Sequence, residues 1–473
     1  MNDNHFIKNL FFAFSAQAIS LILNMIMYLI VPKVLGVSEY SYWQLFIFYG
    51  TYIGFFHFGL NDGIYLKLGG KRYEEIDKKV IGSQFKIGFM YQSIICIGII
   101  IYSIMFVNEY NREFVLICTG IYMLVCNLTM YLGFVFQAIN ETKLYSISII
   151  LDKVFFLTII SILLFLKVNN FKVYIELFLL CKIVAFIYCL YKGREMVFTY
   201  NIKFTIALKE TIDSIKIGIS LILASISNQF ILGSGRIVID NKWGIEVFGK
   251  FSFAISLTSF ILLFISDISM VLFPTLRRAS SKEIKKIYIL MKDGLNLLLP
   301  FVLLLYIPIK TMLTLWLPEY KVSLAYMALL LPLCNFNGKM NLICATYFKV
   351  LRKEKYLLKI NILTMILSVI LSIIGGYIFN NIYFIIISMV FVTAFRSIAS
   401  ELYLSKLMNV KITNQILQEC VLIIIFMISS WYLSEFNSFI IFFISYSIYI
   451  YLNKNKIEYF IEKINNHKIK SLQ

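Results

Sequence analysis

Residues 32–70, PKVLGVSEYSYWQLFIFYGTYIGFFHFGLNDGIYLKLGG, decide how the rest of the chain is interpreted. This stretch follows one long apolar segment, contains a second one, and ends in a basic loop. A weaker version of its residue pattern recurs 208 residues later in the chain. Gly36 corresponds to Gly244, and Tyr40 corresponds to Phe248.

The same offset continues beyond the stretch. Ile76, in a Glu-Ile-Asp-Lys run, corresponds to Ile284 in a Glu-Ile-Lys-Lys run. An offset that holds over about 40 residues, from loop to helix to loop, is typical of a duplicated membrane bundle. The sequence therefore predicts a transporter with two related halves.

The composition excludes a soluble protein. The chain has 473 residues, of which 60% are hydrophobic and 15% charged, and its mean hydropathy is +0.81. Apolar segments of roughly 20 residues recur along the chain, and each can cross a hydrocarbon layer of ~30 Å as a helix. They lack the alternation of barrel strands. We predict an all-α integral membrane protein.

We expect fourteen spans, arranged as six, six and two. The expected domains are an N-terminal six-helix lobe (1–192), a cytoplasmic linker (193–214), a C-terminal six-helix lobe (215–405), and two extra helices with a basic tail (406–473). The predicted spans are 7–31, 40–60, 80–107, 114–139, 146–166, 171–191, 215–238, 247–273, 289–313, 323–348, 357–379, 382–404, 412–433 and 436–452.

The distribution of basic residues supports this topology. With an inward N-terminus, 29 of the 44 Lys and Arg residues lie in inner loops and ends, eight lie outside, and seven lie within spans. Lys and Arg accumulate on the cytoplasmic side of membrane proteins. We therefore expect both termini to be cytoplasmic, and we attribute most of the net charge of +18 to topology.

Several other classes are excluded or disfavoured. The first span is longer than a signal-peptide core and has no small-x-small cleavage site, so it should remain in the protein. No stretch could form a soluble domain that binds nucleic acid, and no Gly-rich loop ends in Lys-Ser or Lys-Thr as a nucleotide site would. The eight cysteines and three histidines lack metal-ligand spacing. We expect no catalytic residue, metal or cofactor.

Seven basic residues fall within predicted spans. A charge at a helix centre costs roughly 2.5–3.5 kcal/mol on insertion scales. Three of them, Lys86, Lys153 and Lys292, lie near the inner ends, where snorkelling to the headgroups is the expected outcome. Asp152 beside Lys153 and Asp293 beside Lys292 could also neutralise charge there. The seven are Lys86, Lys153, Lys182, Arg236, Lys292, Lys339 and Arg396.

Two interpretations are open for the deeper cations Lys182, Lys339 and Arg396. They could form ion pairs between helices, or they could line a cavity that receives an anion. The excess of basic over acidic charge favours the cavity. The acidic partners available for ion pairs are Glu176, Asp267 and Glu401.

Polar residues at repeat-related positions suggest the walls of this cavity. They share one helix face at spacings of three and four residues in the first span, and they recur at the same offset in the seventh. Hydrogen bonding between helices is the alternative reading, and Arg236 could also snorkel to the outer interface. The predicted lining is Gln17, Ser20, Asn24, Tyr28, Ser225, Asn228 and Asp267, with Arg236 on the same face as the seventh-span residues.

The stretch 32–70 resembles the Wzx-type polysaccharide flippases, which belong to the multidrug/oligosaccharidyl-lipid/polysaccharide exporter superfamily together with MATE exporters and lipid II flippases. The fourteen-span plan and the repeat extend the resemblance over the whole chain. The motifs that carry it are Pro32-Lys33-Val34-Leu35-Gly36, Glu39-Tyr40, Gly59-Leu60-Asn61-Asp62-Gly63 and Gly69-Gly70.

The resemblance implies a fold and a function. It implies two lobes in a MATE-like V around a basic cavity lined by the first, second, seventh and eighth helices. The implied substrate is an undecaprenyl-diphosphate-linked oligosaccharide, flipped from the cytoplasmic to the outer leaflet of a bacterial inner membrane for O-antigen (lipopolysaccharide) or capsule synthesis. Partners could include the polysaccharide polymerase and the chain-length machinery. Arg236, Lys339, Arg396 and Lys182 are the candidate diphosphate contacts.

Three other functions remain open. A MATE-like drug exporter would favour carboxylates in the membrane, and residues 7–31 contain none. A peptidoglycan or teichoic lipid flippase of the same fold would look similar in sequence. Membrane polymerases and ligases generally resemble one another in having a long outer loop with catalytic residues. By contrast, no outer loop predicted for this chain exceeds about a dozen residues.

Overall fold

The computed structural model describes residues 17–199, 202–278, 280–410, 412–454, 456 and 458, without the side chains of 263–275, 277, 278 and 281. Within these residues the chain is helical and contains no strand. It forms two compact units, Met1–Gln229 and Phe230–Gln473. The all-α membrane class predicted from sequence is confirmed.

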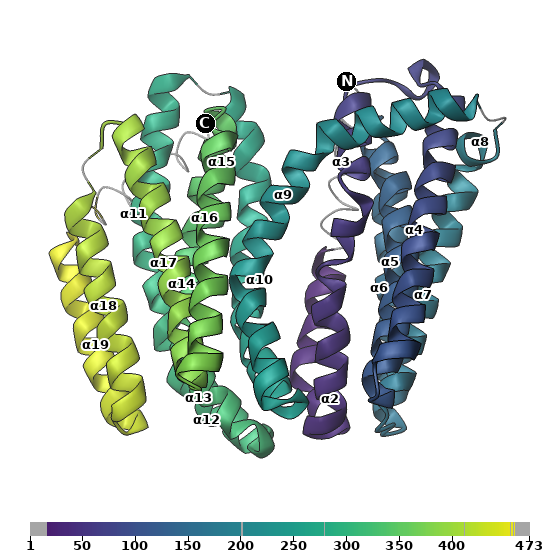
Figure 1. Cartoon of the computed structure of the whole chain (residues 1–473). Coiled ribbons are helices and arrows are strands. Elements are labelled where there is room, and N and C mark those ends of the chain that lie inside the picture. The colour runs from purple at the N-terminus through teal and green to yellow at the C-terminus, as the bar shows by residue number, and fades with distance from the viewer. Residues whose placement is uncertain are drawn as a thin grey trace. The chain divides into compact units, whose positions relative to one another are not determined.

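The first unit is built around α5 (Tyr110–Ala138), which contacts every other long helix of this unit before α9. Figure 1 shows α4 to α7 running side by side. The buried Tyr131 on α5 donates a hydrogen bond to the carbonyl of Ile81 at 2.9 Å. The other elements are a helix over Gln17–Leu29, α2 (Val31–Gly50), η1 (Ile53–His57), α3 (Leu60–Leu68), η2 (Tyr73–Glu75), α4 (Lys78–Phe106), α6 (Thr142–Phe165), α7 (Phe171–Lys192) and α8 (Arg194–Val197).

The second unit packs α10, α11 and α17 against α14, with α18 and α19 paired along its edge (Figure 1). Tyr347 and Tyr288 stack edge to face in its core at 5.2 Å between ring centroids. The elements from the unit boundary onward are α9 (Phe204–Trp243), α10 (Ile245–Arg278), α11 (Ser281–Leu304), α12 (Tyr306–Trp316), η3 (Pro318–Tyr320), α13 (Lys321–Leu330), α14 (Pro332–Lys339), the π-helical η4 (Met340–Ala345), α15 (Thr346–Val350), α16 (Glu354–Ile373), the π-helical η5 (Ile374–Ile378), α17 (Ile382–Leu407), α18 (Thr413–Tyr432) and α19 (Glu435–Leu452).

The described residues contain eleven helices long and apolar enough to span a membrane, or twelve if one bent pair is counted. These eleven coincide with eleven of the fourteen predicted spans. The first two predicted spans fall on the pair Gln17–Leu29 and Val31–His57, which is bent by 69°. The tenth falls on α13 to α15, which breaks at Leu331 and turns π-helical after Lys339. The count of fourteen is not confirmed.

The internal repeat has a local structural counterpart in each unit. Gly36 interrupts α2 with φ of +70°, and Gly244 separates α9 from α10 with φ of +81°. A left-handed backbone favours glycine because it carries no Cβ. The residues four positions on, Tyr40 and Phe248, are both fully buried. The offset of 208 residues therefore relates two glycines with positive φ, each four residues before a buried aromatic side chain.

The helix α9 occupies part of the predicted linker and contributes to both units. Its residues up to Gln229 belong to the first unit, where the backbone of Gly218 meets that of Gly59. A Cβ built on Gly59 would lie 2.6 Å from the carbonyl carbon of Gly218, and one on Gly63 would overlap the carbonyl of Ser214. The GLNDG motif thus provides a close helix crossing. The predicted lobe boundaries themselves stay a prediction.

Candidate functional site

A buried charge network joins three helices of the second unit. The Lys339 ammonium, at the end of α14, is only 2% exposed. It donates a hydrogen bond to Glu419 on α18 and lies 3.7 Å from Glu401 on α17. Glu419 also accepts a hydrogen bond from the amide of Asn335. A charge at this depth needs such partners, because removing it from water is costly.

Arg396 lies beside this network on α17. It is 2% exposed, and its guanidinium donates a 2.8 Å hydrogen bond to the side-chain oxygen of Asn337. Asn337 and Lys339 both lie on α14, so α14 and α17 are joined by two polar contacts. The sequence predicted the depth of both cations and named Glu401 as a possible partner.

Lys292 does not snorkel, so that prediction is wrong. Its side chain on α11 is 3% exposed, and its ammonium donates a hydrogen bond to Gln415 of α18. It also lies 3.8 Å from the carboxylate of Asp293, which accepts a hydrogen bond from Gln415 at 3.1 Å. The helix α18 supplies a polar partner that removes the need to reach the headgroups.

The first unit holds a simpler ion pair. Lys182 on α7 lies 2.6 Å from the carboxylate of Asp152 on α6, and both are largely buried. The sequence paired Asp152 with its neighbour Lys153 instead. Lys86 donates a 3.1 Å hydrogen bond to the carbonyl of Thr199, and its snorkelling to the headgroups stays a prediction.

Arg236 is half-buried on the part of α9 that belongs to the second unit. Its guanidinium donates a 2.9 Å hydrogen bond to the hydroxyl of Ser252 and lies 5.2 Å from the ring centre of Phe248. Cation–π contact of this kind helps to orient a guanidinium. Both partners lie on α10.

The remaining predicted residues are placed on two helices. The hydroxyl of Ser225, on the part of α9 in the first unit, accepts a 3.4 Å hydrogen bond from Gln229. The side chain of Asp267 lies outside the described residues. The facing of the two stripes stays a prediction. Gln17, Ser20, Asn24 and Tyr28 are half-buried on the first helix, whereas Ser225 and Asn228 are exposed.

Sequence reasoning missed Glu419 and Gln415. Both lie on α18, which was expected to be an accessory helix outside the six-helix lobe. A signal was available, because a Gln and a Glu at positions 415 and 419 of an apolar span are four residues apart and share a face. An acidic residue within a span is expensive and requires a partner.

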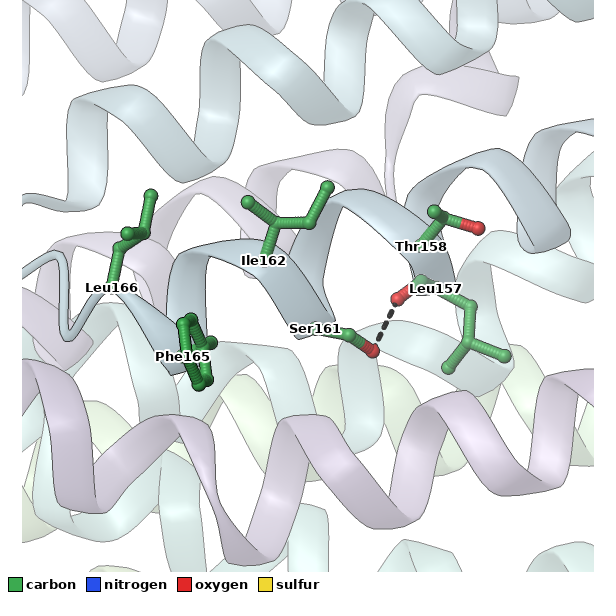
Figure 2. A pocket seen from close by; sticks show the side chains of 6 residues that line it. All are labelled: Leu157, Thr158, Ser161, Ile162, Phe165 and Leu166. Atoms are coloured by element: carbon green, nitrogen blue, oxygen red, sulfur yellow. Dashed lines mark hydrogen bonds between the residues drawn. The ribbon is translucent and has the colours of Figure 1, made fainter.

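The surface grooves described for this fold are mostly apolar. Figure 2 shows one that is lined by α6 and by the residue that follows it, through Leu157, Thr158, Ser161, Ile162, Phe165 and Leu166. The Ser161 hydroxyl donates its hydrogen bond to the carbonyl of Leu157 at 2.8 Å, within the same helix. Apolar side chains and a self-satisfied hydroxyl fit contact with lipid chains rather than recognition of a polar substrate.

The described residues thus form a multi-pass helical membrane protein with ion pairs buried between its helices. Comparison with known proteins defines it further. The family model described as "Polysaccharide biosynthesis protein" matches residues 6–280, more than half of the chain. The chain therefore belongs to the polysaccharide biosynthesis protein family. No curated protein matches the sequence.

Several solved structures share the fold of this chain, including transporters described as members of the MOP superfamily. An inward-facing multidrug resistance MATE family transporter matches with a TM-score of 0.62 and 14% identity, over 83% of this chain and 94% of that one. The lipid II flippase MurJ in an inward closed conformation matches with 0.64 and 12%, over 95% and 100%. A MOP superfamily transporter from Pyrococcus furiosus matches with 0.55 and 13%, over 85% and 94%. The chain therefore shares the fold of these transporters and of this flippase, and the fold that the resemblance implies is confirmed.

Proposed function

We propose that the protein flips undecaprenyl-diphosphate-linked oligosaccharide repeat units from the cytoplasmic to the outer leaflet. Membership of the polysaccharide biosynthesis family carries the proposal. The likeness to a lipid II flippase supports a lipid-linked cargo. In the same proposal, the flipped units supply O-antigen or capsule assembly, and the partners are the polymerase and the chain-length machinery. The protein would lie in the inner membrane with both termini cytoplasmic.

The cargo's chemistry explains why buried cations matter. A diphosphate cannot cross hydrocarbon unpaired, since desolvating a multiply charged ion costs tens of kcal/mol. Arg and Lys can replace its water with charge-assisted hydrogen bonds. The prenyl tail can stay in lipid, so only the head needs a polar path.

We assign the diphosphate contacts to Arg236, Arg396, Lys339 and Lys182. Arg236 comes first, because its guanidinium is oriented by a hydroxyl and an aromatic ring. Lys182 and Lys339 come last, since each would have to exchange a carboxylate for the phosphate. Alternating access would let these groups meet the head from one side and then from the other.

The second candidate is a drug exporter. The carboxylates among the described residues argue against it. Organic cations need acidic groups that can bind them. Among the residues that the structure describes, Asp152, Glu401 and Glu419 each lie within 4.0 Å of a lysine ammonium. The described part of the first helix, Gln17–Leu29, carries no acidic residue.

A deletion strain tests the proposal. We expect it to lose surface polymer and to accumulate lipid-linked repeat units on the cytoplasmic side, with rescue by the wild-type gene. The Arg236→Ala variant, inserted at normal abundance, should fail to rescue, and Arg236→Lys should rescue in part because Lys keeps the charge but loses the bidentate fork. Normal polymer from a strain carrying Arg236→Ala and Lys339→Ala together would end the assignment of the site.

A further inference from the structure

The helix α9 is longer than a membrane span requires. It has 40 residues, and at 1.5 Å per residue it is about 60 Å long. A hydrocarbon layer is ~30 Å thick, so about half of α9 has to lie outside a perpendicular span. We call its first part, residues 204–219, the arm. The predicted seventh span begins only at Ile215, which leaves most of the arm outside it.

The arm crosses α4 instead of running along it. The backbone N–H of Ile202, just before the arm, donates a 3.2 Å hydrogen bond to the hydroxyl of Ser83. Ser214 accepts a 3.3 Å hydrogen bond from the side-chain amide of the adjacent Gln84. Two points separated by about 18 Å of helix can both reach neighbouring residues of α4 only if the arm lies across that helix. Figure 1 shows the start of α9 in this arrangement.

This crossing places the arm at the surface of the membrane. The helix α4 is long and apolar enough to span a membrane, so a helix that lies across it runs along the membrane plane. Ser83 and Gln84 belong to the second turn of α4, which begins at Lys78. The arm therefore lies near the end of a span, at the depth where headgroups meet acyl chains.

The arm has an apolar, a polar and a buried face. Side chains three and four residues apart share a face of a helix. Phe204, Leu208 and Ile212 of the apolar face are 60%, 39% and 42% exposed, and the same face continues with the half-buried Ile215 and Ile219. The polar face beside it consists of Lys209, Asp213 and Lys216, and the buried face consists of Ala207, Thr211, Ser214 and Gly218. The exposed Ile206 and Ile217 lie between the polar and the buried face.

The charges near the arm favour an anionic surface. Residues 67–79 and 192–216 meet here through the ion pairs Lys67–Glu210 and Lys78–Glu195, and each of these ranges carries five basic and three acidic residues. Lys203 and Lys209 are exposed. An apolar helix face with basic residues along its side binds at the membrane interface, and anionic headgroups attract the basic residues.

We propose that the arm docks on the anionic phospholipid surface of the membrane. Phe204, Leu208 and Ile212 would lie at the start of the acyl chains, and Lys203 and Lys209 would face the lipid phosphates. The lipids are those of the bilayer, and not the transported cargo. This inference does not depend on the proposed function, because inactive protein could keep the contact and an active flippase could lack it.

Fluorescence quenching of the full-length protein in vesicles tests the contact. We would label Ile212→Cys or Asp213→Cys with an environment-sensitive fluorophore in a mixture of dioleoylphosphatidylcholine and dioleoylphosphatidylglycerol. The two positions are neighbours on the apolar and the polar face. We expect nitroxides on the acyl chains to quench the probe at 212 and iodide in the water to quench the probe at 213. The eight native cysteines are buried or half-buried, and the labelled wild type gives the background.

The choice of lipid tests the charge. Phosphatidylglycerol with a nitroxide should quench the probe at 212 more strongly than phosphatidylcholine with the same nitroxide at the same mole fraction. Lys209→Gln should lower this preference by up to about fivefold, since one basic residue near an anionic surface contributes about this factor. Lys167→Gln is the matched control, because Lys167 is also exposed but follows the far end of α6, and it should leave the preference unchanged.

Four outcomes would overturn the proposal. Iodide quenching at 212 as strong as at 213 would mean that water covers the apolar face. Protection of the probe at 212 from both quenchers would mean that protein covers it, from this chain or from a second copy. Equal quenching by the two nitroxide lipids, or equal effects of the Lys209 and Lys167 variants, would mean that anionic lipid is not selected there. Leu208→Cys, on the same face, decides the matter if Ile212→Cys fails to fold.

Discussion

Lys339 shows how single residues are stabilised at the depth of the membrane. One ammonium serves two carboxylates from different helices, and Asn335 supplies an additional donor. Removing one member of a buried ion pair is costlier than removing both, because an uncompensated charge is left behind. The network thus fixes α14, α17 and α18 to one another.

Substituting Lys339 by Met should therefore destabilise the protein strongly. We expect a loss of about 3–5 kcal/mol, measured as a lower Tm and lower abundance in the membrane. The double variant Lys339→Met with Glu419→Gln should recover part of it, since one of the two stranded charges is gone. Wild-type stability of the single variant would show that the network does not hold the helices.

Residue patterns predicted the depth of these cations but not all their partners. Lys182 and Lys339 are visible in the sequence as charges near the middle of apolar runs. Their partners depend on which helices are neighbours, which spacing along one helix does not reveal. Asp152 therefore appeared to belong to Lys153, and Glu419 had no assigned role.

At the scale of elements, glycines decide where helices break and where they touch. Gly36 and Gly244 have positive φ, and a Cβ added at either position would meet only open space. Gly63 faces the opposite constraint, because the backbone of Ser214 occupies the position of a side chain. Gly36 and Gly244 are therefore needed for the backbone conformation, and Gly63 is needed for the close approach of two helices.

The two turn glycines should respond alike to substitution. Alanine at Gly36 or at Gly244 should cost about 1–3 kcal/mol, because an L-residue at positive φ is held in a sparsely populated conformation. Thermal unfolding of the two variants measures this. A neutral Gly244→Ala beside a damaging Gly36→Ala would show that the two turns are not equivalent.

The helix crossing gives a sharper contrast. Gly63→Ala should cost about 1–3 kcal/mol or more, because the new methyl overlaps a main-chain carbonyl that cannot move away easily. Gly98→Ala on α4 meets nothing within 4 Å and should be neutral or stabilising by up to about 1 kcal/mol. Equal Tm values for the two variants would contradict the crossing.

Elements were predictable to the extent that their helices are continuous. Eleven of the predicted spans match described helices and follow from hydropathy alone. The interruptions at Leu331 and after Lys339 come from Pro332 and from a π-helical turn, which depend on packing and hydrogen bonding in the folded unit. Hydropathy averages over such breaks.

For the whole molecule, the topology remains to be measured. Reporter fusions after Arg112, Lys242 and Glu435 should report the outside, and fusions after Lys79, Arg278 and Gln473 the inside, because basic residues accumulate on the cytoplasmic face. Accessibility of the reporters in intact cells provides the readout. A C-terminus found outside would refute the fourteen-span arrangement.

A second whole-molecule test addresses the two polar stripes. Cysteines at Gln17 and Ser225 should crosslink in one state of the transport cycle if both residues line one cavity. A second pair, with cysteines at Gln17 and Leu221, provides a reference for distance, because Leu221 lies four residues before Ser225 on α9. If no crosslink forms under any condition, the two stripes do not line one cavity.

The helix α9 has a consequence for how the chain is made. Its first 26 residues pack with the N-terminal unit, through Gly218 and through a 2.5 Å ion pair between Lys67 and Glu210. Until the ribosome has synthesised them, the backbone of α3 at Gly59 and Gly63 stays uncovered. The N-terminal unit therefore cannot complete its packing before these residues of α9 have been synthesised. The boundary between the two compact units, at Gln229 and Phe230, thus lies later in the chain than the lobe boundary predicted from the repeat.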